Sequence, residues 1–350
     1  MRVEIAVIDS IAEVSAADFE RLDTSAGAVG SYQRISQREA DGRWLTRYLR
    51  CLDGDRLLAL IPLHTAQGTS WPDPVYDPTG WPLPVTDTQD CQADSCLLVG
   101  SNSDLLTGLP VAAELRAPEP LRALLARIAR LAADEGRCLA FPFHYSSAQQ
   151  AIDRAGNGAI RWALLGREAR LEGLDDPGWE AGLSRPARYN LRHDRALIEA
   201  AGIRSSIVDW AEVAEPASAL IAEHNVRVGM FDHPEFVKLR GQRWQDCPGV
   251  EFLVFAAESD TLTGYVTGWV WRDELAVYEI GLPGPESPER LACYLELVFR
   301  RPIQLAQQRG LRMLRLGPTA ERIKAGRGAV FHELFGGVLD VVATKHLAGG

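Results

Sequence analysis

Apolar and polar positions in the first half of the chain follow the period of a strand in some segments and that of a helix in others. The chain opens on an alternating segment, and Ser15 is the expected N-cap of the helix that follows. Asp53-Gly54-Asp55 separates two strand-like runs and predicts a tight hairpin. Apolar residues at helical spacing end at Gly136 and lead into another strand. The predicted elements are strands over 2–7, 44–52, 57–63, 97–99 and 138–143 and helices through 15–22 and over 119–135.

The second half repeats this order of elements. Strands are predicted over 251–257, 262–271 and 275–280, with an acidic turn between the first two. A helix over 288–309 ends at Gly310 and precedes a strand over 311–316. This repetition predicts an α/β (α+β) fold in two related halves, with a boundary near 165–180. The alternative is coincidence, because mixed α/β domains often use such units.

Residues 64–96 differ from the rest because proline and tryptophan are concentrated there. The composition predicts a long ordered loop or lid that forms neither a ladder nor a helix. Trp71, Tyr76 and Trp81 offer flat apolar surfaces that could close over a substrate. The alternative is a loop packed over the core of the first half.

The charge balance narrows the choice of partners. The 350 residues include 47 acidic and 37 basic side chains, which gives a net charge of -10. A chain this acidic does not coat nucleic acid or an anionic membrane with its whole surface, so we expect no DNA partner. The N-terminal segment lacks a signal-peptide pattern, and no window reaches the roughly 18–20 apolar residues of a membrane span. We therefore expect a cytoplasmic protein without a membrane span.

Common metal and nucleotide motifs are absent from the sequence. The six cysteines are spread along the chain, and the one close pair, Cys91 and Cys96, has the wrong spacing for a zinc knuckle. We expect reduced thiols and no metal site. The chain has no P-loop, G-x-G-x-x-G fingerprint, G-x-S-x-G elbow or H-E-x-x-H motif, and its seven histidines do not cluster.

Two basic segments stand out against the acidic background. In the first, Arg185, Arg188, Arg192 and Arg195 recur at steps of 3, 4 and 3, so a helix over 184–201 places them on one face. Repulsion among four like charges favours a phosphate-bearing partner for this face. The alternative is a solvated basic surface.

The second segment follows the last predicted strand of the repeat. From 309 to 327 it holds six basic residues and one acidic residue, and it includes one of only three lysines, Lys324. A Gly317-Pro318 turn leads to Arg322, Lys324 and Arg327, an arrangement in which backbone amides and cations can converge on an anion. The alternative is a surface turn whose charges point to water.

These segments resemble Fem-like acyltransferases of the GNAT superfamily. Residues 184–202, with an Arg-Tyr-Asn-Leu-Arg core and a following Glu-Ala-Ala-Gly, are similar to the helix that opens the second half of those enzymes. Cys293-Tyr294-Leu295-Glu296, a Gly-ended helix, a strand, and Gly317 through Lys324-Ala-Gly-Arg327-Gly328-Ala329 are similar to the C-terminal signature of the peptidoglycan-biosynthesis-like branch.

The resemblance covers residues 180–335 or so and implies a fold for the whole chain. That fold is two tandem GNAT-like domains, 1–170 and 171–350, each a mixed, mostly antiparallel sheet flanked by helices. The first would be a degenerate GNAT-like domain that carries the Pro/Trp-rich loop 64–96. The second would carry the basic site.

The resemblance also implies a reaction in which an amine attacks an activated ester or thioester directly, without a covalent enzyme intermediate. Fem-like enzymes use aminoacyl-tRNA, and the usual acetyl-CoA pyrophosphate loop is absent from its position here, so an aminoacyl-tRNA donor is favoured over acyl-CoA. No tightly bound cofactor is expected, and the acceptor is an amine of a small molecule, a cell-wall precursor or a natural product. The alternatives are an acetyl-CoA-dependent N-acetyltransferase and a non-catalytic protein that binds tRNA or another phosphorylated ligand.

The expected site residues follow from these two lines of argument. Glu279 lies near the end of a strand and is the candidate general base, with Tyr294 and Glu296 as second choices. The alternative for Glu279 is a merely solvated carboxylate. The candidates for binding donor or acceptor phosphates are Lys324, Arg327, Arg322, Arg188, Arg192 and Arg185.

Overall fold

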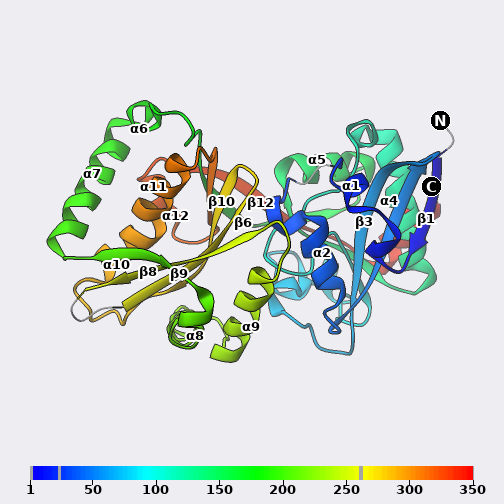
Figure 1. The fold of residues 1–350 in the computed structure, drawn as a ribbon. Helices are drawn as coiled ribbons and strands as arrows, with labels where there is room; N and C mark the ends of the chain where they lie inside the picture. Colours follow the sequence, from blue (N-terminus) through cyan, green and yellow to red (C-terminus); the bar gives the residue numbers. More distant parts are fainter. Residues whose placement is uncertain (1–2, 23–24, 260–262, 350) are drawn as a thin grey trace. The chain divides into compact units, whose positions relative to one another are not determined.

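The computed structural model describes residues 3–22, 25–259 and 263–349. The chain divides into two compact units, one formed by Met1–Gly166 with Glu333–Gly350 and the other by Arg167–His332 (Figure 1). Each unit contains a mixed sheet flanked by helices, which confirms the predicted α/β class.

In the first unit the strands lie in the order β1-β2-β3-β4-β5-β12. Neighbouring strands are antiparallel except for β4 and β5, which are parallel. The strands are β1 (Val3–Ile8), β2 (Trp44–Asp53), β3 (Arg56–Ala66), β4 (Cys96–Val99), β5 (Cys138–Tyr145) and β12 (Val330–Leu339). The helices are α1 (Ala16–Phe19), α2 (Tyr32–Glu39), α3 (Val85–Thr88), α4 (Pro118–Asp134), α5 (Ser146–Ala155) and α13 (Val341–Gly349).

Side chains of this sheet alternate between two cores, as the pleat of a strand requires. Leu97 and Leu139 pack into the core that also holds the apolar face of α4. Their neighbours Leu98 and Ala140 point to the other face, into a second core that includes Tyr76 and other residues of the Pro/Trp-rich segment. The sheet is therefore buried on both faces.

The Pro/Trp-rich segment packs over the sheet and does not present open aromatic surfaces. Tyr76 is fully buried and Trp81 is 7% exposed. The prediction of neither ladder nor helix was wrong at several points, since β3 extends to Ala66 and the segment contains α3 and the 3-10 turns Pro74–Tyr76 and Pro78–Gly80. Asp73 and Asp77 stabilise those turns, because their carboxylates accept the N–H groups two residues later and a proline follows each of them.

In the second unit the order is β6-β11-β10-β9-β8-β7, and only β10 and β11 are parallel. The strands are β6 (Arg161–Glu172), β7 (Arg204–Val208), β8 (Glu251–Glu258), β9 (Thr263–Trp271), β10 (Glu274–Gly281) and β11 (Met313–Gly317). The helices are α6 (Trp179–Gly182), α7 (Arg185–Ala200), α8 (Trp210–Arg227), α9 (Pro234–Gln245), α10 (Arg290–Leu295), α11 (Arg301–Gln308) and α12 (Glu321–Ala325).

Helices cover both faces of these strands as well. Leu191 of α7 and Ile303 of α11 share one core with Phe255 and Val266, whereas Ile221 of α8 and Val237 of α9 pack on the opposite side (Figure 1). The helix predicted over 288–309 begins at Arg290 and contains a π turn, Glu296–Arg300, between α10 and α11. Pro302 has no N–H for the carbonyl four residues earlier, and the helix widens directly before it.

The two units have the same order of strand pairings, in agreement with the predicted repeat of elements. A hairpin, β2–β3 or β8–β9, is followed by a further strand, by helices and by a parallel partner, β5 or β11. The last strand differs, because β12 from the end of the chain pairs with β5 while β6 pairs with β11. Residues 333–350, which the sequence analysis placed in the second half, therefore belong to the first unit.

Most predicted boundaries agree with the structure to within a few residues. The helix capped by Ser15 is shorter than predicted and ends at Phe19. Arg2, Asp260 and Leu262, at predicted strand or turn ends, lie outside the described residues. Among the helices that the structure describes, none combines the length and the apolar character needed to cross a bilayer.

Candidate functional site

The parallel ladder of the second unit is short and is fixed by a buried ion cluster. It joins Glu274–Ala276 of β10 to Met313–Arg315 of β11. Arg315 donates to Glu274 of β10 and to Glu168 of β6, each at 2.9 Å, and the three side chains are 2–7% exposed. A buried pair of this kind is costly to break because the remaining charge is left unpaired. The cluster therefore holds β6, β11 and β10 together at this level.

Beyond Ala276, β10 no longer pairs with β11 and continues as the partner of β9 only. The register between these two strands shifts between Val277 and Ile280, which marks a β-bulge. The Glu279 N–H donates to the hydroxyl of buried Thr267 at 3.2 Å, so the bulged backbone has a side-chain partner. Bulges re-aim side chains near functional sites, and here the residue concerned is the predicted base, Glu279.

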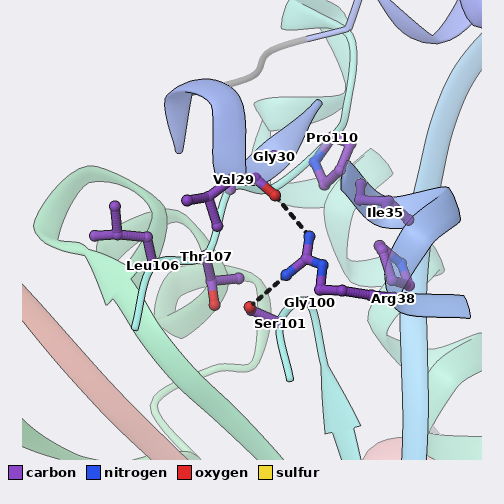
Figure 2. Close-up of a pocket in the computed structure, with 11 residues that line it drawn as sticks. Val29, Gly30, Ile35, Arg38, Gly100, Ser101, Leu106, Thr107 and Pro110 are labelled. Carbon is purple, nitrogen blue, oxygen red and sulfur yellow. Dashed lines mark hydrogen bonds between the residues drawn. The ribbon is translucent and has the colours of Figure 1, made fainter. Parts of the chain in front are cut away.

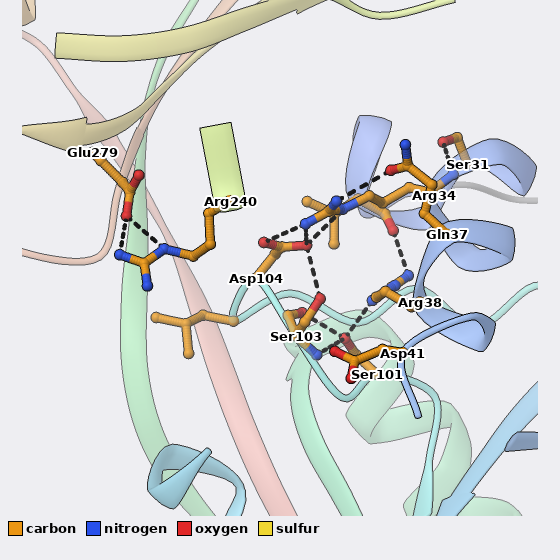
Figure 3. Close-up of polar contacts among 12 residues, drawn as sticks. Ser31, Arg34, Gln37, Arg38, Asp41, Ser101, Ser103, Asp104, Arg240 and Glu279 are labelled. Atoms are coloured by element: carbon orange, nitrogen blue, oxygen red, sulfur yellow. Dashed lines mark hydrogen bonds and ion pairs between the residues drawn. The ribbon is translucent and has the colours of Figure 1, made fainter. Parts of the chain in front are cut away.

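Glu279 belongs to a charged network that the sequence analysis did not predict. Arg240 of α9 donates to the Glu279 carboxylate at 2.6 Å (Figure 3) and also to Asp232, at 2.6 Å. Asn225 also donates to Asp232, at 2.7 Å. Burial raises the pKa of Asp232, but hydrogen bonds from Arg240 and Asn225 outweigh that effect and leave the pKa below its usual value. Burial lowers the pKa of Arg240, but the charge of Glu279 more than reverses this, so the guanidinium stays protonated.

The structure brings the two basic segments of the sequence together. Asn190 of α7 donates to the Gly326 carbonyl at 2.7 Å. Arg327 makes a bidentate pair with Asp194 of α7, with both N–O distances at 2.6 Å. Gly328 has a φ of +88°, and a Cβ at this position would lie 2.6 Å from the Leu183 side chain. The segment after β11 is therefore packed closely against α7.

Lys324 lies inside this packing. Its side chain is 1% exposed, and its ammonium donates to the carbonyls of Leu316 at 2.6 Å and Gly317 at 3.0 Å. Burial lowers the pKa of Lys324 to about 8, although the charges of Glu168 and Glu321 oppose this shift. Lys324 thus ties α12 to the end of β11. Its predicted contact with phosphate stays a prediction, and that contact would require it to leave the two carbonyls.

Acidic partners compensate most of the +5 charge found locally in the sequence. Arg309 pairs with Glu251, Arg312 with Asp273, Arg315 with Glu168 and Glu274, and Arg327 with Asp194. On α7, Arg188 donates to the carbonyls of Ala181 and Leu183, and Arg195 pairs with Glu180. Arg185, Arg192 and Arg322 are exposed, so these three cations of the two segments face solvent.

The two second-choice catalytic residues are both largely buried. Glu296 is 3% exposed and is held by the Ser205 hydroxyl and by Arg300, the latter at 3.2 Å. The Tyr294 ring packs edge-on against Phe299, with ring centroids 5.9 Å apart. Burial raises the pKa of Tyr294 to about 12, against an opposing effect of Arg327, so its hydroxyl stays protonated. The Glu279 side chain is also largely buried, at 10% exposed against 4% for Glu296, and its Oε2 atom is buried as well.

A small cavity lies in the second unit beside these helices. Its lining includes Trp179, Asp194 of α7, and Phe299 and Arg300 of the π turn, and its volume is about 50 Å³. This volume holds a few water molecules but not an acyl donor. Asp194, which closes one side of the cavity, is the partner that neutralises Arg327.

The first unit also contains a buried charged network, which the sequence analysis missed. Arg34 of α2 pairs with Asp104 at 2.9 Å, and the two side chains are 6% and 3% exposed (Figure 3). Asp104 and Leu105 have φ values of 64° and 55°, a left-handed conformation that costs energy for residues other than glycine. Burial raises the pKa of Asp104, but Arg34 and Arg38 outweigh that effect, so the pKa lies below its usual value.

Arg38 and a narrow cavity lie next to this pair. Arg38 donates to the Ser101 hydroxyl at 3.0 Å and to the Val29 carbonyl at 2.6 Å, as Figure 2 shows. The cavity that these residues line has a volume of about 10 Å³, close to the minimum for one water molecule. Gly100 has a φ of +108°, and a Cβ there would lie 2.2 Å from the Thr107 side chain, so only glycine fits. The loop after β4 is therefore tightly packed around this cavity.

Two buried histidines complete the polar interior of the first unit. His64 contacts the Thr46 hydroxyl at 2.9 Å and the Gly100 carbonyl at 3.3 Å. Burial lowers the pKa of His64 to about 3, and Arg38 adds to the effect; burial alone lowers the pKa of His144 to about 4. Both imidazoles are neutral at pH 7.

No family model and no curated protein matches the sequence. Solved structures do match it over nearly its whole length. FemX aligns with a TM-score of 0.64 at 10% identity and covers 99% of this chain and 100% of that chain. The fold is a Fem-like GNAT fold.

Two further structures share this Fem-like GNAT fold. A tandem GNAT protein from the clavulanic acid biosynthesis pathway has a TM-score of 0.57 at 11% identity, with 97% of this chain and 99% of that chain covered. L-PGS from Bacillus licheniformis has a TM-score of 0.53 at 10% identity, with 92% and 89% covered. At these identities the likeness concerns the fold alone.

Proposed function

We propose that the chain is an N-acyltransferase that transfers an aminoacyl group from aminoacyl-tRNA to an amine. The observation that carries the proposal is the position of Glu279 within this fold. Its carboxylate lies at a bulge beyond the short β10–β11 ladder and is paired with Arg240. An ion pair stabilises the charged form of a carboxylate, and the charged form is the one that can accept a proton.

In the proposed reaction the acceptor nitrogen attacks the ester carbonyl of the donor directly. A C–N bond forms, the C–O bond to the tRNA ribose breaks, and the ribose hydroxyl leaves with a proton. Glu279 takes the proton that the amine loses and passes it to the leaving ribose oxygen, and bringing the two substrates together supplies most of the acceleration. Tyr294 and Glu296 remain second choices for the base, since the Tyr294 hydroxyl stays protonated and the Glu296 side chain is 4% exposed, against 10% for Glu279.

The donor phosphates are proposed to bind the exposed cations of the second unit. Arg185 and Arg192 lie on α7, and Arg322 lies on α12, whose following residues pack against α7. Arg188, Lys324 and Arg327 support this surface from inside, through carbonyls and Asp194. The acceptor is an amine of a small molecule, cell-wall precursor or natural product, as the resemblance to Fem-like enzymes implies.

An acetyl-CoA-dependent N-acetyltransferase is the second candidate. The likeness to the tandem GNAT protein supports it, because the name of that structure refers to AcCoA. In this case the thioester would replace the tRNA ester as the group attacked, and Glu279 would keep the same role. A non-catalytic protein that binds a phosphorylated ligand is the remaining alternative, and it would need no base.

The experiment incubates the purified chain with a pool of radiolabelled aminoacyl-tRNAs or with labelled acetyl-CoA, each with and without a panel of amines. Amine-dependent release of aminoacyl label as an amide supports the proposal. Transfer from acetyl-CoA alone assigns the second candidate. Tight donor binding with no transfer to any amine contradicts both enzyme assignments. Binding to tRNA that weakens steeply with salt is expected, because each phosphate contact releases counterions.

A further inference from the structure

Three cysteines that are far apart in the sequence meet inside the first unit. The sulfur atoms of Cys91, Cys96 and Cys138 all lie within 4.8 Å of one another. Each of the three residues is 0% exposed, and none is in a disulfide. The sequence argument against a metal considered the spacing of Cys91 and Cys96 alone. The third cysteine joins them 42 residues after Cys96.

The sheet register explains how the cluster forms. Cys96 is the first residue of β4 and Cys138 the first residue of β5, and the two face each other as the first rung of the parallel ladder. Side chains at facing positions of neighbouring strands point to the same side of the sheet. Cys91 reaches them from the turn before β4, where the Ser95 hydroxyl donates to the Asp90 carbonyl at 3.0 Å. The Ser95 carbonyl accepts the Cys138 N–H at 3.0 Å and joins this turn to β5.

The surroundings of the three sulfurs are apolar. The same core contains Trp44, Trp81, Leu98 and Val338, all of them at most 7% exposed. Within the residues that the structure describes, no fourth His, Cys, Asp or Glu side chain joins the group. The cluster is thus a set of three soft donors closed off from water.

We propose that Cys91, Cys96 and Cys138 bind one Cu(I) ion through three sulfur ligands. Sulfur donors select soft ions such as Cu(I) and Zn(II) and disfavour Mg²⁺, Ca²⁺ and Mn²⁺, which prefer oxygen. Structural Zn(II) is almost always four-coordinate, with sulfurs roughly 3.8 Å apart at Zn–S distances of about 2.3 Å. Three donors with no fourth side chain match the trigonal geometry that Cu(I) accepts. An apolar wall also excludes competing ligands and protects the reduced ion.

Cu(I) binding exchanges thiol protons for Cu–S bonds. Three thiols lose up to three protons to the buffer, three Cu–S bonds form, and copper stays in the +1 state, so no oxidant or reductant is needed. The ion would connect the turn before β4 to the first rung of the β4–β5 ladder. Loading should therefore stabilise the first unit against unfolding, because an ion that binds only the folded state shifts the equilibrium towards it.

The test titrates the reduced full-length chain with Cu(I) under nitrogen, in competition with bicinchoninate. The wild type is expected to bind one ion per chain, with thiolate-to-copper charge-transfer absorption and three sulfur scatterers in X-ray absorption. Loss of a ligand should weaken binding by more than the roughly 10–100-fold that loss of an outer-shell partner costs. We expect this for C91A, C96A and C138A. Cys51→Ala is the matched control, because Cys51 is equally buried in the same unit but lies outside the cluster.

Circular dichroism of each variant separates loss of the site from loss of the fold. Absence of one-to-one binding in the wild type overturns the proposal. The proposal is also overturned if C96A and C138A bind Cu(I) as tightly as C51A does. Preferential binding of Zn(II) over Cu(I) in the same competition overturns the assignment of the ion. Acyl transfer is measured independently of these titrations, so the two proposals fail or stand separately.

Discussion

In the first unit, the parallel strands β4 and β5 pair through Cys96–Leu98 and Cys138–Ala140; in the second, β10 and β11 pair through Glu274–Ala276 and Met313–Arg315. Both ladders have three rungs and occupy the same place in the strand order. The first is lined by thiols and aliphatic groups. The second includes two members of a buried ion cluster.

The units differ most where the ladder ends. β4 ends at Val99, and Gly100 turns the chain into a tightly packed loop that holds Asp104 against Arg34. β10 continues through a bulge to Glu279 instead. The same strand order therefore leads to a tightly packed loop after β4 in the first unit and to a strand that carries Glu279 near its end in the second. The proposal that the chemistry belongs to the second unit rests on this difference.

The largest expected effect is on catalysis by Glu279. Glu279→Gln keeps the size of the side chain and removes the proton acceptor, so turnover should fall by roughly 10²–10⁴-fold. The control is Glu251→Gln, the same change at an exposed residue of β8, which should turn over at the wild-type rate. Single-turnover transfer assays measure both variants. A Glu279→Gln enzyme as fast as the control would remove Glu279 from the mechanism.

The next effect concerns the buried cluster at the second ladder. Arg315→Met removes the cation that Glu274 shares with Glu168, which keeps only Arg170, so the free energy of unfolding should fall by about 3–5 kcal/mol. Arg312→Ala removes a pair whose side chains are 52% and 56% exposed, and should cost about 1 kcal/mol or less. Urea unfolding compares the two variants. Equal losses would show that the cluster does not hold the strands.

A smaller effect is expected on the stability of the first unit, which should depend on pH through His64 and His144. The folded-state pKa values of His64 and His144, about 3 and about 4, lie below the unfolded value of 6.5. The unfolded chain therefore binds more protons as the pH falls below 6.5, and stability should decrease down to about pH 4. The slope is about 1.4 kcal/mol per histidine and pH unit once the unfolded imidazole is protonated. His64→Gln should flatten the curve of unfolding midpoint against pH, and an unchanged curve would contradict a buried neutral His64.

The smallest effect is expected at the exposed cations of α7. The double variant R185A/R192A should weaken tRNA binding and lower the slope of log affinity against log salt by about 1.4–1.8, for two lost phosphate contacts. The double variant R21A/R56A is the control, because it also removes two exposed arginines, with 66% and 63% exposed side chains, from the first unit. Equal salt slopes in the two variants would place the tRNA elsewhere.

Local patterns predicted the elements whose signals lie in one stretch of sequence. Examples are α7, predicted over 184–201, and the hairpin around Gly54, because periodicity and turn chemistry act over a few residues. The sequence patterns did not predict β6 or β12. Each of these strands pairs with a strand far away in the sequence, β6 with β11 and β12 with β5. The sequence analysis also missed α2, α5, β7, α8, α9 and α13.

The candidate site depends even more on contacts between residues that are far apart in the sequence. The first basic segment was found by the period of its arginines and the second by its local charge, and a shared phosphate-binding surface was expected. Their neutralisation was not, since Asp194 and Arg327 are 133 residues apart. Arg240, which pairs with Glu279, and Asp232, which pairs with Arg240, gave no local signal in the sequence. Cys138 joined Cys91 and Cys96 only through the register of β4 and β5, which depends on the folded sheet.

The most direct test of catalysis by Glu279 is the single-turnover transfer of labelled aminoacyl groups from a mixed aminoacyl-tRNA pool to an amine panel. It is run side by side with the wild type, Glu279→Gln and Glu251→Gln. We expect amide formation by the wild type and Glu251→Gln and a loss of roughly 10²–10⁴-fold for Glu279→Gln. Amide formation at equal rates by all three proteins, or by none of them with any donor and amine, would contradict this expectation.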